Sequence, residues 1–116
     1  MQLAIRRCVI VGMLKLKPVE KQREAVLDLL RSVVEPIRVE PGCLGCYLCL
    51  VLDDPGTILL VYEWQSDQDL TRHLRTRRYG RILAAIELSQ AEPQVEFMTV
   101  ARKEGLEVIE KARGRG

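Results

Sequence analysis

The strand-like segments of this chain carry apolar side chains on both of their faces. Residues 5–16 predict a first strand, in which apolar side chains alternate from one face to the other. Residues 57–65 predict another strand with the same property. A sheet with two apolar faces must be covered on both sides, so this feature limits how the chain can fold. In the first strand the alternating residues are Val9, Val11 and Met13 on one face, and Cys8, Ile10 and Leu14 on the other.

A helix is predicted between the first two strands. Apolar residues recur there at helical spacing, with charged residues on the opposite face. Pro36 and the Pro41–Gly42 pair predict the end of this helix. Residues 43–52 then predict a second strand, and the Asp-Asp-Pro-Gly turn at 53–56 joins it to the strand at 57–65 as a hairpin. The apolar positions of the helix are Val26, Leu27, Leu30, Val33, Val34 and Ile37.

The second half of the chain predicts helices followed by one more strand. Ser66 is a good N-cap for a short helix, and a second helical stretch follows it. Residues 94–103 alternate in the manner of a half-exposed strand. Residues 104–113 predict an amphipathic tail helix, so we expect a domain over residues 1–103 and a helical tail over 104–116.

The predicted order β-α-β-β-α-β favours the ferredoxin-like α+β fold, an antiparallel sheet with its helices on one face. Those helices cover only one of the two apolar faces. A second copy of the chain is the simplest cover for the other face, so we expect a homodimer.

Composition narrows the class of protein further. The chain has 116 residues, of which 47% are apolar and 29% charged, as in one globular domain. Its net charge of +2 gives no reason to expect a nucleic-acid partner. No apolar run is long enough to span a membrane, and the N-terminal residues do not resemble a signal peptide. We therefore expect a cytoplasmic protein whose four cysteines stay reduced.

Four short motifs, in their order and spacing over residues 5–102, resemble the antibiotic biosynthesis monooxygenase (ABM) domain of the dimeric α/β-barrel superfamily. Each motif is short, and the resemblance rests on the set. The motifs are Arg38 to Cys43, Tyr62 to Ser66, the His73 helix followed by Tyr79, and the Glu92–Pro93 break.

The resemblance implies a ferredoxin-like protomer, a dimer whose two sheets form a barrel, and a ligand pocket between the sheet and the helices of each protomer. Some members of the family oxidise polycyclic phenols or quinols with O₂ and need no cofactor, whereas others degrade haem or only bind small molecules. The haem-degrading members use an Asn, and this chain contains none. The family also often has a second His in the second helical region, where Arg77 or Arg78 stands here.

His73 and Glu63 are the candidate catalytic residues. His73 is the only histidine, and a His with an ordinary pKa can take a proton from a phenol near neutral pH. The alternative is a core histidine held by a hydrogen bond. Glu63 stands among apolar residues and needs a donor, for which Arg38 and His73 are candidates. It would orient His73 or, as we consider more frequent, form an ion pair at the dimer interface.

Trp64, Tyr79 and Arg38 are the candidate substrate-binding residues. Trp64 would form an aromatic wall for a flat small aromatic substrate, although a plain core role is equally consistent with its position. Tyr79 lies in a predicted helix near His73, and its hydroxyl could hold a substrate oxygen. Arg38 would stabilise an oxyanion or serve as a structural partner.

Cys43, Cys46 and Cys49 form a C-x₂-C-x₂-C run. On a strand, Cys43 and Cys49 would face one way and Cys46 the other, so we expect small buried hydrophobic residues rather than a metal site. The arginines between residues 72 and 81 spread over more than one helical face and predict a solvated surface.

Two functions fit the sequence. The first is a cofactor-independent monooxygenase acting on an aromatic or quinol-like small molecule. The second is a non-catalytic dimeric module of the same fold that binds a small molecule or only assembles.

Overall fold

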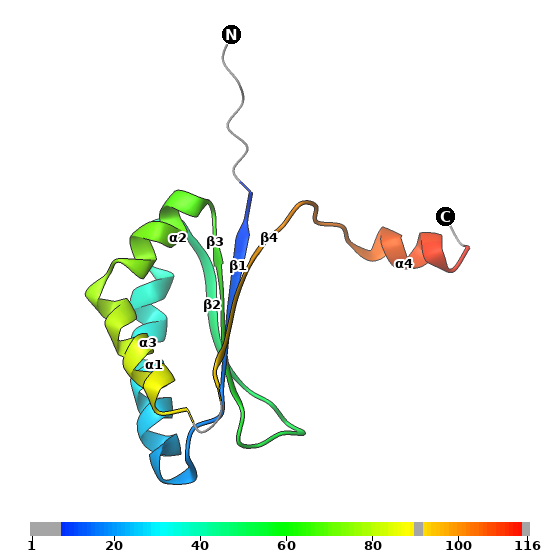
Figure 1. Cartoon of the computed structure of the whole chain (residues 1–116). Helices are drawn as coiled ribbons and strands as arrows, with labels where there is room; N and C mark the ends of the chain where they lie inside the picture. Colours follow the sequence, from blue (N-terminus) through cyan, green and yellow to red (C-terminus); the bar gives the residue numbers. More distant parts are fainter. Residues whose placement is uncertain (1–7, 90–91, 115–116) are drawn as a thin grey trace.

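The computed structural model describes residues 8–89 and 92–114 of the chain. Its centre is a four-stranded sheet with the strand order β2-β3-β1-β4, in which every neighbouring pair is antiparallel. The prediction of a ferredoxin-like α+β fold is confirmed, including the pairing of the last strand with the first (Figure 1). The strands are β1 (Ile10–Leu16), β2 (Cys43–Leu50), β3 (Ile58–Trp64) and β4 (Gln94–Thr99).

Three helices lie on one face of this sheet, as predicted (Figure 1). A short 3₁₀ turn, η1 (Glu20–Gln22), leads into the first of them. None of the helices in the described part of the chain is long and apolar enough to cross a membrane. The helices on the sheet are α1 (Arg23–Arg38), α2 (Asp67–Leu74) and α3 (Arg77–Glu87).

The core lies between the sheet and these helices. Along β3, alternate residues are fully buried, and the four that face the helices are Ile58, Leu60, Tyr62 and Trp64. All six apolar positions predicted for the first helix are buried against them. Gly12 on β1 also faces this core, and a Cβ atom there would lie 2.3 Å from Cε1 of Tyr62. A glycine at this position therefore makes room for the Tyr62 ring.

The prediction that Pro36 helps to end the first helix is wrong. Pro36 lies inside α1, which continues to Arg38. The proline removes the one backbone donor that would bond to the carbonyl of Ser32, and the complete burial of Ile37 in the core offsets that loss. The chain turns instead at Gly42, whose φ of +81° suits glycine.

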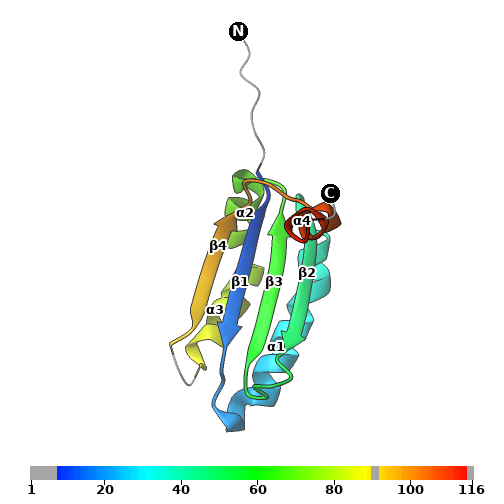
Figure 2. The same ribbon diagram turned by 90° about the vertical axis from the view of Figure 1, so that its right-hand side faces the viewer.

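The other face of the sheet is open. In Figure 2 the four strands face the viewer, and no helix of the sheet domain covers them. The residues on this open face are partly or largely exposed, and along β1 and β3 their neighbours on the other face are buried, whereas every residue of β4 is exposed. Both faces of β1 and β3 are thus apolar, as the sequence predicts, but only one face is covered. The apolar residues of the open face are Val11, Met13, Tyr47, Cys49, Leu59, Val61 and Met98.

The predicted tail helix is present as α4 (Leu106–Ala112). We call residues 100–112 the arm. It leaves the end of β4 and extends away from the protomer on the side of the open face (Figures 1 and 2). None of the residues of α4 is buried. The division between a domain ending at residue 103 and a separate tail stays a prediction.

Candidate functional site

His73 lies at the centre of a box of aromatic rings on the helix-covered face of the sheet. It comes from the last turn of α2, and none of its surface is exposed. The indole of Trp64 stacks on the imidazole, with ring centroids 4.5 Å apart and planes inclined by 28°. Tyr62 and Tyr79 meet the imidazole edge-on, at 5.2 Å and 5.4 Å between centroids. The imidazole of His73 therefore faces the sheet.

A carboxylate that the sequence analysis missed holds His73 in this position. Nδ1 of His73 lies 3.0 Å and 3.2 Å from the two carboxylate oxygens of Glu40, whose side chain is 9% exposed. Arg78, in the first turn of α3, donates from its guanidinium to Glu40 over 2.6 Å. The three residues form a continuous chain of contacts from the surface to the buried imidazole, because the Arg78 side chain is 33% exposed.

The turn between α1 and β2 places Glu40 beside α2. Backbone hydrogen bonds from Glu40 to Ile37 and from Cys43 to Glu40 close this turn, at 3.0 Å and 3.1 Å. Gly42 completes it, and a Cβ atom at Gly42 would lie only 2.1 Å from Cγ of Asp69. The turn thus lies against the start of α2, where Asp69 is about one helical turn before His73. These contacts fix the backbone of the turn, from which the Glu40 side chain reaches His73.

Glu63, the residue predicted to orient His73, lies on the opposite side of the sheet. It follows Tyr62 and precedes Trp64 on β3, and both of these neighbours face the helices. The strict alternation of side chains along a strand therefore sends Glu63 to the open face. The prediction of a Glu63–His73 pair is wrong for this reason. Within residues 8–89 and 92–114, Glu63 forms neither a hydrogen bond nor an ion pair.

Arg38 has the structural role that the sequence left open as one alternative. Its Nε donates to the backbone carbonyl of Cys46 over 3.0 Å, and its guanidinium lies 5.9 Å from the ring centroid of Tyr47. It also pairs with Glu35 one turn earlier on α1. These contacts tie the end of α1 to β2. They involve none of the residues that surround His73.

Trp64 and Tyr79 both reach the site for which they were predicted, and Tyr62 joins them. Tyr79 is half-buried and Trp64 fully buried. Thr76 caps α3 by accepting a hydrogen bond from the Tyr79 backbone over 3.2 Å, which fixes the start of that helix next to His73. Of the three tyrosines, only Tyr79 was predicted to lie at the site. The signal for Tyr62 was the alternation along β3, which puts residues 62 and 64 on one face.

The surroundings of His73 favour the neutral imidazole. Burial lowers the pKa of His73 below its ordinary value of 6.5, and the positive charge of Arg78 lowers it further, although the hydrogen bond to Glu40 raises it. A carboxylate accepts hydrogen bonds only, so we assign the proton of the neutral ring to Nδ1. Nε2 is then an unprotonated nitrogen with a free lone pair. Burial also raises the pKa of Tyr62 and of Tyr79, so both phenols stay protonated.

Two buried polar atoms at this site have no hydrogen-bond partner among the described residues. One is Nε2 of His73 and the other is Nε1 of Trp64. They belong to two stacked rings, so they lie in the same region of the core. Nε2 accepts a hydrogen bond in the assigned tautomer, and the indole Nε1–H donates one. Buried polar groups usually have hydrogen-bond partners, so this acceptor and this donor together indicate a place where a polar group of a ligand could bind.

The cysteines differ from the prediction in one respect. A β-bulge between Cys43 and Gly45 leaves Leu44 unpaired, so Cys43 and Cys46 both face the helices and Cys49 faces away. The predicted grouping of Cys43 with Cys49 is therefore wrong. Burial raises the pKa of Cys43, and that of Cys46 to about 12, so both are thiols. The described part of the chain holds no group of three or more side chains arranged to bind a metal ion.

The sequence as a whole identifies the family. The family model for the antibiotic biosynthesis monooxygenase domain matches residues 9–85, which include β1, α1, the Glu40 turn and the whole site around His73. The chain belongs to this family. No curated protein matches the chain.

Solved structures share the fold. Rv0793 from Mycobacterium tuberculosis has a TM-score of 0.76 and 21% identity, over 84% of this chain and 99% of that one. PA3566 from Pseudomonas aeruginosa has a TM-score of 0.72 and 24% identity, and the match covers 82% of this chain and 96% of that one. A third structure is a Nitrosomonas europaea protein described provisionally as an antibiotic biosynthesis monooxygenase. It has a TM-score of 0.74 and 17% identity, and the match covers 89% of this chain and 100% of that one. At these identities the comparisons show a common fold.

Proposed function

We propose that this protein is a monooxygenase that oxidises a phenolic or quinol-like aromatic molecule with O₂. The chain belongs to a family described by that class of reaction, which supports the type of chemistry. The residues around His73 support the kind of substrate. His73 is the general base, Glu40 holds its tautomer, and Trp64 and Tyr79 are the walls against which a flat ring packs.

The observation that carries the proposal is the pair of buried atoms without partners. A phenol hydroxyl donates one hydrogen bond and accepts others. It can donate to Nε2 of His73 while it accepts from Nε1–H of Trp64, and so satisfies both atoms at once. The same contact places the phenol proton on a nitrogen that is ready to take it. The indole N–H then stabilises the phenolate oxygen that forms.

The reaction needs no reductant other than the substrate. His73 removes the hydroxyl proton, and the electron-rich phenolate reduces O₂. A phenol with a free ring C–H position becomes a quinone: one atom of O₂ enters the product and the other leaves as water with the two hydrogen atoms of the substrate. The proton held by His73 returns to the water that is formed.

A ligand reaches this site past Tyr79. His73 and Trp64 have no exposed surface, whereas Tyr79 is half-buried in the first turn of α3. Rotation of the Tyr79 ring away from His73 would uncover the edge of the imidazole. Binding therefore exchanges an edge-on aromatic contact within the protein for a contact with the substrate ring.

Oxygen uptake with a panel of polycyclic phenols and hydroquinones tests the proposal. We expect at least one compound to consume O₂ and to give a quinone carrying one atom from isotopically labelled O₂. His73→Ala should reduce the rate by about 10²- to 10⁴-fold, and added imidazole should restore part of it through the vacated space. Glu63→Gln, on the opposite face, is the matched control and should retain the rate.

The second candidate is a non-catalytic dimeric module, and the complete burial of His73 favours it. In that case Glu40 and the aromatic rings simply satisfy a core histidine. No uptake across the panel, with the wild-type protein folded, would support this candidate. Either function is consistent with the homodimer that we infer from the open apolar face, and dimers are common in the family.

A further inference from the structure

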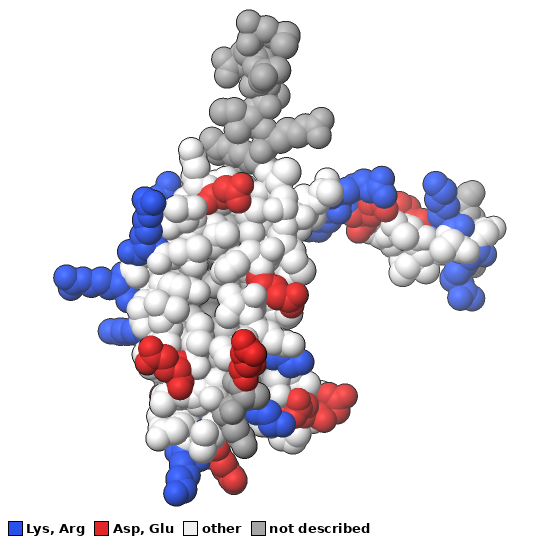
Figure 3. Space-filling model, in the orientation of Figure 1, with Lys and Arg blue, Asp and Glu red and all other residues white. Residues whose placement is uncertain are grey.

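Five arginines lie close together in the sequence where α2 ends and α3 begins. No acidic residue stands between Asp69 and Glu87, so this stretch of the chain is strongly basic. In the space-filling view, basic side chains project from the edge of the molecule along which α2 and α3 lie (Figure 3). This edge borders the site described above, because α2 carries His73 and α3 carries Tyr79. The five arginines are Arg72, Arg75, Arg77, Arg78 and Arg81.

Two of these arginines are already paired with carboxylates. Nη1 of Arg72 lies 2.9 Å from a carboxylate oxygen of Asp69, and Nη1 of Arg78 lies 2.6 Å from one of Glu40. For the other three, no described residue provides an ion pair or a hydrogen bond to the guanidinium group. All three residues are exposed, so they leave an excess of positive charge at this edge. They are Arg75, Arg77 and Arg81.

Three of the five arginines lie at the start of α3, where the helix itself disfavours them. The N-terminal end of a helix carries a partial positive charge, and α3 has no acidic residue in its first turn. Arg77 and Arg81 are four residues apart, and Arg78 and Arg81 are three apart, so the three positive charges are neighbours on the helix surface. We call these three residues the arginine cluster. A bound anion would offset both sources of repulsion. Space is available beside the cluster, because a Cβ atom at Gly80 would meet no other atom within 4 Å.

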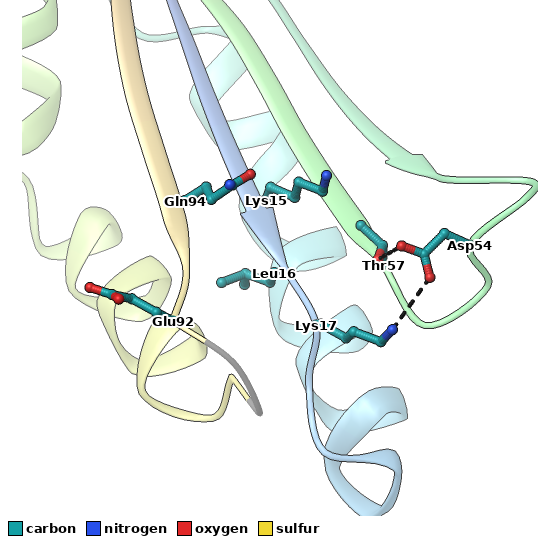
Figure 4. A pocket seen from close by; sticks show the side chains of 7 residues that line it. All are labelled: Lys15, Leu16, Lys17, Asp54, Thr57, Glu92 and Gln94. Atoms are coloured by element: carbon teal, nitrogen blue, oxygen red, sulfur yellow. Dashed lines mark hydrogen bonds and ion pairs between the residues drawn. The ribbon is translucent and has the colours of Figure 1, made fainter.

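The lysines at the end of β1 show the contrast. Lys15 and Lys17 line a pocket there together with Asp54 and Glu92 (Figure 4). Nζ of Lys17 lies 3.5 Å from a carboxylate oxygen of Asp54. Positive and negative groups balance in that pocket, so an anion would gain little by binding there. The arginine cluster has no such balance.

The arginine cluster adjoins the route by which a ligand reaches His73. Arg78 directly precedes Tyr79, past which that route runs, and only the Glu40 carboxylate separates its guanidinium group from the imidazole. At the inner end, Nε2 of His73 has no hydrogen-bond partner among the described residues. A ligand that binds Nε2 with one polar group therefore has its outer end close to the arginines.

We propose that the substrate is an aromatic acid, whose phenol hydroxyl binds at His73 and whose carboxylate, at the far end of the ring system, binds the arginine cluster. The inference rests on the proposed function, because it names the class of substrate for that same site. Guanidinium groups form two parallel hydrogen bonds with a carboxylate, which suits this role. Arg77 and Arg81 hold the carboxylate, while Arg78 remains with Glu40 and adds its charge.

The carboxylate of such a substrate lies far from the hydroxyl that reacts. The arginine cluster therefore strengthens binding equally before and during the reaction, and so it lowers KM without changing kcat. Neutral phenols of the same shape reach the same site but bind more weakly.

Anaerobic calorimetry with two matched probes tests the inference. One probe is a hydroxynaphthoate with its hydroxyl and carboxylate on different rings, and the other is its carboxamide, which differs in charge but little in shape. No oxidation occurs without O₂, so binding is measured independently of any reaction. We expect the acid to bind at least about tenfold more tightly than the amide at low salt, and the difference to shrink as salt is added. Equal affinities, or no binding of the acid, would overturn the inference.

Variants of the full chain locate the carboxylate. Arg77→Gln and Arg81→Gln should each weaken binding of the acid about three- to tenfold and leave the amide unchanged. Arg31→Gln, which removes an exposed arginine of α1, is the matched control and should change neither. Unchanged affinity for the acid in both cluster variants would contradict the inference.

The imidazole signals of His73 show whether the acid enters the site. We expect both probes to shift these signals in an NMR titration. Binding of the acid that leaves His73 unperturbed would confine the anion to the outer surface and overturn the inference.

Oxygen uptake separates this inference from the proposed function. If the acid is oxidised, Arg81→Gln should raise its KM about as much as its Kd and leave kcat unchanged. Binding of the acid at His73 without O₂ uptake by any compound would keep the aromatic acid as the ligand and count against the monooxygenase. Uptake that is equally fast with acid and amide at low concentration would support the monooxygenase and overturn the role of the arginine cluster.

Discussion

The two faces of the sheet are both apolar, but their surroundings differ, because helices cover one face and leave the other open. On the helix-covered face, Tyr62 and Trp64 are fully buried and surround His73 with aromatic rings. On the open face, Val61 and Glu63 come from the same strand, and no helix covers them. Within the described part of the chain, the first face has two buried nitrogen atoms without a hydrogen-bond partner, and the second has the carboxylate of Glu63 without a partner and an arm whose helix has no buried residue.

This difference shows where each face finds its missing contacts. The covered face is packed as a core, so what it lacks is a hydrogen-bonding group that can reach Nε2 of His73 and Nε1 of Trp64. The open face lacks a whole layer, and a layer can come only from another macromolecule. The two carboxylates, Glu40 and Glu63, follow the same division, since one holds a histidine within the chain and the other faces outward. Substitutions on the two faces should therefore have different consequences.

The largest expected effect separates the faces by stability. Trp64→Ala removes a completely buried side chain and should lower the free energy of unfolding by about 3–5 kcal/mol at any protein concentration. Tyr47→Ala, on the open face, should act through the dimer, so its effect should change with protein concentration. Chemical denaturation at two concentrations measures both. Equal, concentration-independent losses would mean that the faces do not differ in this way.

The two carboxylates give the next prediction. Glu40→Gln removes the charge next to His73, so it should lower the pKa of His73 further and cost about 1–3 kcal/mol of stability. Glu63→Gln should leave the pKa of His73 unchanged. NMR titration of the only histidine measures the pKa in both variants. A shift caused by Glu63→Gln would contradict the placement of that residue.

Stability should also depend on pH through His73. The pKa of His73 is lower in the folded protein than its ordinary value of 6.5, so the unfolded chain binds more protons as the pH falls. Stability is therefore complete above pH 6.5 and should be lost progressively below it. Thermal unfolding of the wild type between pH 7.5 and about pH 5, beside His73→Phe, isolates this contribution. A wild type that becomes more stable as the pH falls through that range would mean that folding raises the pKa of His73, which would contradict the prediction.

The smallest effect concerns Arg78. Its charge lowers the pKa of His73, so Arg78→Gln should raise that pKa. The rise should be small, because the Arg78 side chain is one-third exposed and water screens it. Arg81→Gln, a more exposed neighbour on α3, is the control that should leave the pKa unchanged. The same NMR titration measures the pKa of His73 in both variants, and a lower His73 pKa in Arg78→Gln would contradict the geometry.

The sequence predicts most of the fold because local patterns specify it. The alternation in β3, the helical spacing in α1 and the Ser66 cap each depend on residues close together in the chain. The features that were missed depend on details that periodicity does not contain. The bulge at Leu44 reverses the side on which Cys43 lies, and the core contact of Ile37 carries α1 past Pro36.

The candidate site was predicted in part for a related reason. His73, Trp64 and Tyr79 could be found from the face on which each lies. Glu40 lies 33 residues from His73, in a turn, and no period relates the two. The signal was the Glu-Pro-Gly turn itself, because a positive φ at Gly42 presses that turn against α2. Glu63 attracted the prediction because it stands next to Trp64 in the sequence, although adjacent strand residues face opposite ways.

The protonation state of His73 tests the account most directly. The chain contains one histidine, so a long-range ¹H–¹⁵N spectrum of tag-free protein shows a single imidazole. The account predicts that at pH 7 the ring is neutral, with its proton on Nδ1 beside Glu40 and a bare Nε2. A proton on Nε2, or a ring that is fully protonated at pH 7, would contradict it, because Nε2, the ring nitrogen that does not face Glu40, could then not take a proton from a substrate.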